Sequence, residues 1–152
     1  MPFTGPGLYE IVPFRAQGLT ASAWDGLLDA GALVRLSTRT PSDPATNSVW
    51  EVALASGEGE SAEYLILNAL TGYPITATAD RTTTSTPQIS PADPTTRWTI
   101  ESISSDVFTI NSKVASRGQF SVKGGDYQSG VDIMAWVTGN TDNQRWYFER
   151  RP

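Results

Sequence analysis

The chain has 152 residues, of which 39% are hydrophobic and 18% charged, a composition typical of a globular protein with one buried core. Its formal net charge of −5 offers no electrostatic footprint for nucleic acid, and no apolar run approaches the roughly 20 residues of a membrane helix. Because cysteine and histidine are both absent, disulfides, thiolate nucleophiles, the usual general base and the commonest metal ligands are excluded. We therefore predict a protein that binds without catalysis and without a cofactor.

The N-terminal segment that precedes the first predicted strand bears on the location of the protein. The opening segment, MPFTGPGLYEI, lacks the basic region and apolar core of a secretory signal. Together with the missing cysteines, this predicts a reducing, cytoplasmic location.

Three predicted strands share one pattern, an aromatic residue followed two positions later by isoleucine. The segments are LYEIV at Tyr9, YLILN at Tyr64 and FTINS at Phe108. This alternation is typical of a half-buried strand.

Three tryptophans close the segments that these strands open. Trp50, Trp98 and Trp146 are spaced 48 residues apart, in SVWEVAL, TRWTIES and NQRWYFER. A fixed period indicates an internal repeat, so we divide the single domain, residues 1–152, into units at about 8–55, 63–103 and 107–150. The tryptophans are expected to pack in a shared core.

The third unit shows how each repeat divides further. Its predicted strands are 107–112, 119–123, 131–137 and 144–150, separated by turn-forming clusters of Gly, Ser, Asn and Asp. No segment has a sustained helical period. Three units of four strands predict about twelve strands, which a closed, pseudo-threefold all-β barrel accommodates without exposed sheet edges.

Three segments between the predicted strands contain residues whose surroundings can be predicted. The acidic connector ASGEGESAE, 55–63, is predicted to be solvated. Trp24 lies near Leu27 and Leu28, which are either buried or part of an apolar contact patch. Tyr127 is predicted at a loop tip, where an aromatic ring suits stacking or protein contact.

The Gln-x-Trp ending at Gln144–Trp146, the 48-residue period and the GLYEI start resemble the ricin-B-like β-trefoils, especially those of mushrooms. The resemblance covers nearly the whole chain. It implies a β-trefoil of twelve short strands in three pseudo-symmetric repeats. It also implies a fungal-type lectin or, on the same fold, a protease inhibitor, in either case with a role in fungal defence.

In lectins of this family, a second-strand Asp accepts hydrogen bonds from sugar hydroxyls and a third-strand aromatic stacks on the sugar. An Asn or His and the motif Gln complete the polar rim. Carried onto repeat three, this pattern places Trp136 at the stacking position, Asn143 and Gln144 on the rim, and Ser121 at the Asp position. Asp126, in the turn GGDYQSG, is either a further sugar-site candidate or a turn residue.

The other two repeats depart further from the pattern. The residues at the Asp, aromatic and Gln positions are Ser22, Ser37 and Ser48 in repeat one and Thr76, Pro91 and Thr96 in repeat two. Replacing a carboxylate by a hydroxyl costs a site about 1–3 kcal/mol, the difference between charged and neutral hydrogen bonds. We therefore expect a degenerate set of sugar sites, with repeat three as the survivor.

The alternative function is inhibition of a trypsin-like serine protease through an exposed loop. A rigid loop that loses little entropy binds a protease cleft tightly, and a trypsin-like target needs Arg or Lys at its apex. The candidates are Arg81 in TADRTTTSTP, Arg39 in LSTRTPSDP and Lys123 in SVKGGDYQSG. The expected partners are thus glycans or glycoproteins, or else a secreted serine protease, for a monomer or weak homodimer that binds neither nucleic acid nor membrane.

Overall fold

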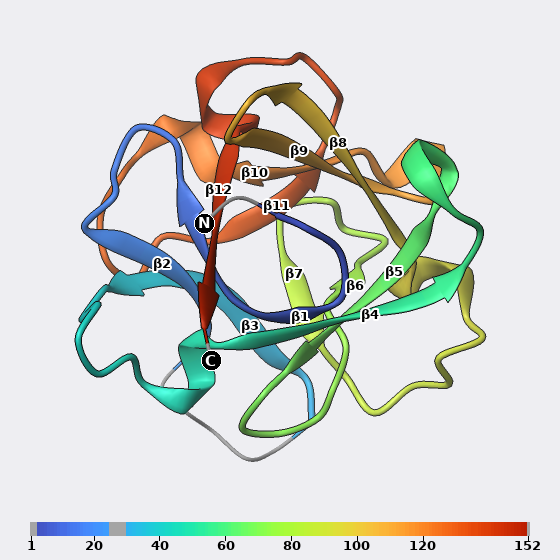
Figure 1. The fold of residues 1–152 in the computed structure, drawn as a ribbon, viewed down its shortest axis with the longest axis horizontal. Helices are drawn as coiled ribbons and strands as arrows, with labels where there is room; N and C mark the ends of the chain where they lie inside the picture. The colour runs from blue at the N-terminus through green and yellow to red at the C-terminus, as the bar shows by residue number, and fades with distance from the viewer. Residues whose placement is uncertain (1–2, 25–29, 152) are drawn as a thin grey trace.

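The computed structural model describes residues 3–24 and 30–151, and this part of the chain contains twelve β-strands and no α-helix (Figure 1). The strands are β1 (Gly7–Pro13), β2 (Leu19–Ala23), β3 (Ala32–Thr38), β4 (Trp50–Ser56), β5 (Glu63–Asn68), β6 (Thr76–Ala77), β7 (Thr84–Thr86), β8 (Trp98–Ser104), β9 (Val107–Ser112), β10 (Gln119–Val122), β11 (Ile133–Trp136) and β12 (Trp146–Arg151). The predicted all-β class is confirmed. No helix long and apolar enough to cross a bilayer occurs among these described residues.

Half of the strands close a barrel. The pairing runs β9–β12–β1–β4–β5–β8 and returns from β8 to β9, so none of these six strands is left as an edge of that ring. The other strands form three antiparallel hairpins, β2–β3, β6–β7 and β10–β11. In Figure 1, β1 and β12 run side by side, and the start of β1 pairs with the end of β12 at Leu8 and Arg151.

The three repeated tryptophans occupy equivalent places in the core, as the sequence predicts. Each is fully buried and begins a barrel strand. Each indole N–H donates to a carbonyl of the adjacent hairpin. The pairs are Trp50 to Ala21 at 3.0 Å, Trp98 to Ile75 at 2.9 Å and Trp146 to Phe120 at 3.0 Å. These bonds tie each hairpin to the barrel strand that ends its repeat.

The aromatic residues of the Tyr-x-Ile pattern form a second core layer. Tyr9, Tyr64 and Phe108 surround the ring of Phe3, with centroids 5.4, 5.4 and 5.9 Å from it. Phe148 adds a fourth contact at 5.0 Å. The leader therefore supplies a central side chain to a layer to which all three repeats contribute.

The last strand begins later than the sequence pattern predicts, at Trp146 instead of residue 144. The preceding residues, Asp142–Gln144, form a 3₁₀ turn. Its capping box joins Thr141 and Gln144, whose side chains each pair with the backbone of the other. Local hydrogen bonding at a helix start thus competes with the strand for these residues.

The acidic connector is solvated over most of its length, since Gly57–Ser61 are exposed. Its end is different. Ala62 is buried, and the Glu63 carboxylate bonds Lys113 at 2.9 Å and Arg97 at 3.3 Å. The Lys113 ammonium beside it holds the pKa of Glu63 below its usual range. This residue joins the start of repeat two to the junction with repeat three.

Candidate functional site

The tryptophan hydrogen bonds show which hairpin residues are equivalent. Since Ala21, Ile75 and Phe120 accept the three indole N–H groups, they occupy matching positions. The residues that follow them are Ser22, Thr76 and Ser121. The alignment of these hydroxyl residues at the position of the family's Asp is therefore consistent with the three-dimensional repeat.

These hydroxyls are turned into the protein. Ser22 and Ser121 are 0% exposed and Thr76 is 6% exposed. The Ser121 hydroxyl donates to the Gln119 carbonyl at 2.8 Å and accepts from Gln144 Nε2 at 3.0 Å. Ser121 is thus satisfied internally, which corrects the expectation that it lies in the sugar site.

Gln144 is also structural. Its Nε2 donates to the Val137 carbonyl at 2.8 Å and its Oε1 accepts from the Gly139 N–H at 2.9 Å. The side chain is 2% exposed, and Ser48 and Thr96 at the same position are buried as well. The place of Gln144 on a polar rim is therefore corrected, because its amide fixes the segment that joins β11 to β12.

Asn143 anchors the same turn from its other side. Its Nδ2 donates to the Val122 carbonyl at 2.9 Å, and its Oδ1 accepts from the Thr141 hydroxyl. In repeat one, Asn47 donates to the Ala23 carbonyl at 2.8 Å, which is the matching bond. The half-buried Asn143 is thus committed on both sides of its amide, and a rim role for it has no support in this geometry.

Trp136 differs from all these residues because its side chain is 43% exposed. Trp136 is the last residue of β11 and pairs with Gln119 of β10. In repeat one, Ser37 pairs with Thr20 in the same way, so Ser37 occupies the position equivalent to Trp136. Gly118 precedes this pair with a φ of 91°, and a Cβ there would lie 1.9 Å from the Trp136 carbonyl oxygen. Only glycine permits this approach, so Gly118 helps to set the place of the tryptophan.

In repeat two, the position equivalent to Trp136 is not Pro91. Thr76 pairs with Ser85, and continuing that register by two residues brings Pro87 opposite Pro74. Because the β6–β7 connection is shorter than the β10–β11 connection, the equivalent position lies four residues before Pro91. The correction leaves repeat two without an aromatic residue at this position.

Arg81, from the connection between β6 and β7, lies against Trp136. Its Cζ is 5.5 Å from the ring centroid, within the range of a cation–π contact. Its backbone has a φ of 66°. The reactive residue of a substrate-like inhibitory loop must be extended, so this left-handed conformation contradicts that role for Arg81.

The other two cationic candidates are not apexes of extended loops either. Arg39 has a side chain only 13% exposed and binds both carboxylate oxygens of the buried Glu10, at 3.1 and 3.3 Å. This contradicts the prediction of a free loop arginine. Lys123 is exposed but begins a 3₁₀ turn, Lys123–Gly125.

The β10–β11 connection holds the remaining repeat-three candidates. Asp126 is exposed, and its N–H donates to the Lys123 carbonyl at 3.1 Å, which is the turn role foreseen as an alternative. Tyr127 is half-buried and packs on the core instead of standing free at a loop tip. Burial raises the pKa of the Tyr127 phenol.

Repeat one presents a second tryptophan near the surface. Trp24 is half-buried, and Arg35 Cζ lies 5.7 Å from its ring centroid. Arg35 in turn pairs with Asp132 at 2.7 Å. Leu27 and Leu28, expected in a core or contact patch beside it, lie outside the described residues.

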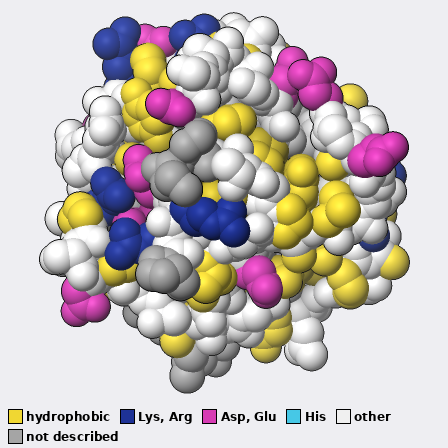
Figure 2. Space-filling model, viewed as in Figure 1, with side chains coloured by type: hydrophobic (Ala, Val, Ile, Leu, Met, Phe, Trp, Pro, Cys, Tyr) yellow, Lys and Arg dark blue, Asp and Glu magenta, His cyan; other side chains and the backbone are white. Residues whose placement is uncertain are grey.

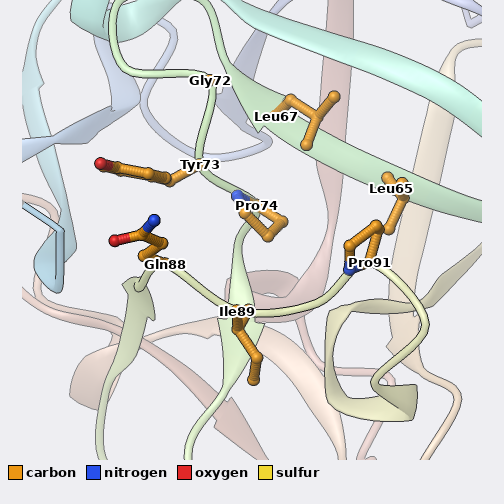
Figure 3. Close-up of a pocket in the computed structure, with 8 residues that line it drawn as sticks. All are labelled: Leu65, Leu67, Gly72, Tyr73, Pro74, Gln88, Ile89 and Pro91. Atoms are coloured by element: carbon orange, nitrogen blue, oxygen red, sulfur yellow. The ribbon is translucent and has the colours of Figure 1, made fainter.

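A pocket of about 370 Å³ in repeat two has no sequence motif to predict it. Figure 3 shows Leu65 and Leu67 projecting from β5 toward Pro74 and Pro91. Its lining is otherwise Gly72, Tyr73, Gln88 and Ile89. In Figure 2, hydrophobic side chains gather on the right of the molecule, where β4 and β5 run in Figure 1. The pocket is largely apolar and has no charged residue in its lining.

Comparisons with known proteins agree on both fold and family. The model of the ricin-type beta-trefoil lectin domain-like family matches residues 46–136. An agglutinin of Sclerotinia sclerotiorum is 48% identical over 154 residues, which cover 99% of this chain and 100% of the agglutinin.

Solved structures extend the agreement. The designed threefold symmetric protein ThreeFoil has a TM-score of 0.81 at 16% identity, covering 95% of this chain and 99% of its own. The Rhizoctonia solani agglutinin has a TM-score of 0.79 at 16% identity, covering 99% of this chain and 100% of its own. These likenesses confirm the predicted β-trefoil. With the family model and the 48% identical agglutinin, they establish that this chain belongs to the ricin-type β-trefoil lectin-like family.

Proposed function

We propose that this protein is a non-enzymatic lectin whose sugar site is centred on Trp136. The observation that supports this most directly is the 43% exposure of that ring on a hairpin whose neighbouring polar side chains are satisfied internally. The similarity to a Sclerotinia sclerotiorum agglutinin supports the same class of function.

An indole suits this task because it offers a flat apolar surface at low conformational cost. The C–H face of a sugar ring packs on such a surface. Ser37 and Pro87, which occupy the same position in the other repeats, offer no such ring. The set of sites is therefore degenerate, and repeat three retains the stacking residue.

The test is glycan-array binding of the wild-type protein, followed by titration calorimetry with the best ligand. Trp136→Ala is expected to weaken binding at least about fivefold, since one desolvated aromatic contact contributes on the order of 1 kcal/mol or more. Leu54→Ala is the matched control, because Leu54 is 51% exposed on β4 and is not part of the hairpin. It is expected to bind as the wild type does.

Two outcomes count against the proposal. A folded wild-type protein that binds no glycan contradicts the function itself. Binding that survives Trp136→Ala but is lost in Trp24→Ala contradicts the site and moves it to repeat one. Circular dichroism of each variant separates loss of binding from loss of fold.

A further inference from the structure

We propose that the ligand of the Trp136 site carries an anionic group, a carboxylate or a sulfate ester, which Arg81 recognises. This inference rests on the proposed function. It adds a charged partner, from the neighbouring repeat, to a site otherwise defined by one ring. The contact that supports it is the 5.5 Å separation between Arg81 Cζ and the Trp136 ring centroid.

Arg81 is held in place by its own connection. Its N–H donates to the Thr78 carbonyl at 3.2 Å, and the Thr78 hydroxyl donates to the Thr83 carbonyl at 2.8 Å. The Thr84 hydroxyl then donates to the Ile133 carbonyl at 2.9 Å, which fastens this hairpin to β11. The backbone of Arg81 is therefore fixed before a ligand arrives, and the contact with the Trp136 ring places its guanidinium, which reduces the entropy lost on binding.

The charge of Arg81 is not neutralised within the described residues. Most other arginines have a carboxylate partner; these are Arg15, Arg35, Arg39, Arg97, Arg145 and Arg151. Among the residues that the structure describes, Arg81 has no such carboxylate partner, and its neighbour Asp80 is exposed. Its Nε is buried without a hydrogen-bond partner. A buried atom is closed to a ligand, so the donors that remain for one are those of the two terminal Nη groups, for which the described residues provide no hydrogen-bond partner.

The site offers hydrogen-bond donors in place of the acceptor that is typical of the family. A family lectin would offer an Asp, which accepts hydrogen bonds from sugar hydroxyls, but Ser121 is buried at that position. Arg81 offers donors and a positive charge instead. A ligand complementary to this site supplies acceptors, and a charged acceptor bonds a guanidinium about twice as strongly as a neutral one. Because its net charge is −5, the protein as a whole does not attract anions. A preference for an anionic ligand would therefore come from contacts within the site.

The experiment measures Kd for matched saccharide pairs, each with and without one anionic group. One series compares glucoside with glucuronide and galactoside with its sialylated form, and another compares galactoside with its 6-sulfate. The wild type is expected to bind the anionic member about tenfold more tightly at low salt, with the advantage shrinking as ionic strength rises. The two series show whether a carboxylate or a sulfate is preferred.

Arg81→Gln is expected to reduce the preference to less than about twofold while leaving affinity for the neutral member unchanged. Lys113→Gln is the control, since it removes the same charge from a residue that pairs with Glu63. Equal affinity within every pair overturns this inference but leaves the proposed lectin intact. A preference that persists in Arg81→Gln, or disappears equally in Lys113→Gln, overturns it too. If no saccharide binds the folded wild type, the proposed function fails as well.

Discussion

Gln144 shows how the polar groups of one residue of a family motif can be engaged within the fold. Its amide donates to Ser121 and Val137 and accepts from Gly139. Two backbone groups of the segment between β11 and β12, and the hydroxyl of Ser121 in β10, therefore depend on one buried side chain. A buried group that loses its partner costs about 1–3 kcal/mol, more than the bond itself contributes when formed.

We therefore predict that Gln144→Ala lowers the free energy of unfolding by about 1–3 kcal/mol, as measured by urea denaturation. The matched change in repeat one is Ser48→Ala, whose hydroxyl lies 3.5 Å from that of Ser37 and makes a weaker contact. That variant is expected to lose less stability. Unchanged stability in Gln144→Ala, together with weaker sugar binding, would assign Gln144 to the ligand and reverse our reading.

Among the elements, the leader before β1 has the least obvious role in the sequence. Phe3 inserts between the aromatic side chains that begin the three repeats, and it also contacts Phe148 of β12. Tyr9, one of these aromatics, donates its hydroxyl to the Gly5 carbonyl at 2.7 Å, which turns the leader back over the barrel. The segment thus covers the aromatic layer at its centre.

Phe3→Ala is predicted to destabilise the protein by about 2–4 kcal/mol, slightly less than the usual cost of removing a fully buried Phe, because Phe3 is half-buried. Chemical denaturation gives the size of the effect. Phe3→Leu is the comparison, since it keeps much of the volume and is expected to recover more than half of the loss. Equal stability of Phe3→Ala and wild type would show that the leader does not cover the core in solution.

These elements also mark the limits of prediction from sequence. The strands and the tryptophan period could be predicted because alternation and repetition are local properties of the chain. The role of Phe3 could not, since its leader has no strand pattern and its partners lie far away in sequence. The sequence does not predict that Pro87, instead of Pro91, is equivalent to Trp136, because no motif in repeat two signals that the β6–β7 connection is shorter. The burial of Ser121 likewise depends on Gln144, 23 residues further along the chain.

At the scale of the whole molecule, the repeats are joined more tightly than those of an open array. Each connection between the strands of a hairpin reaches the next repeat. Arg81 of repeat two contacts Trp136 of repeat three, and Asp132 of repeat three pairs with Arg35 of repeat one. The Gly31 N–H of repeat one then donates to the Thr86 carbonyl of repeat two at 2.9 Å. Together with the closed barrel, this cyclic contact pattern couples the stability of all three units.

The three core tryptophans provide the test of that coupling. Trp50→Phe, Trp98→Phe and Trp146→Phe each remove an indole N–H and leave a buried carbonyl without its partner. Each is expected to lower the free energy of unfolding by a similar amount, about 1–3 kcal/mol. Because the units share one core, the loss is expected in a single cooperative transition, seen together by far-UV circular dichroism and by the fluorescence of the remaining tryptophans. In a solenoid, where repeats contact only their neighbours, the weakened unit would unfold first and the two signals would separate. Separate transitions in any of these variants would mean that the threefold barrel behaves as three loosely coupled units, despite the pairing of β1 with β12 that closes it.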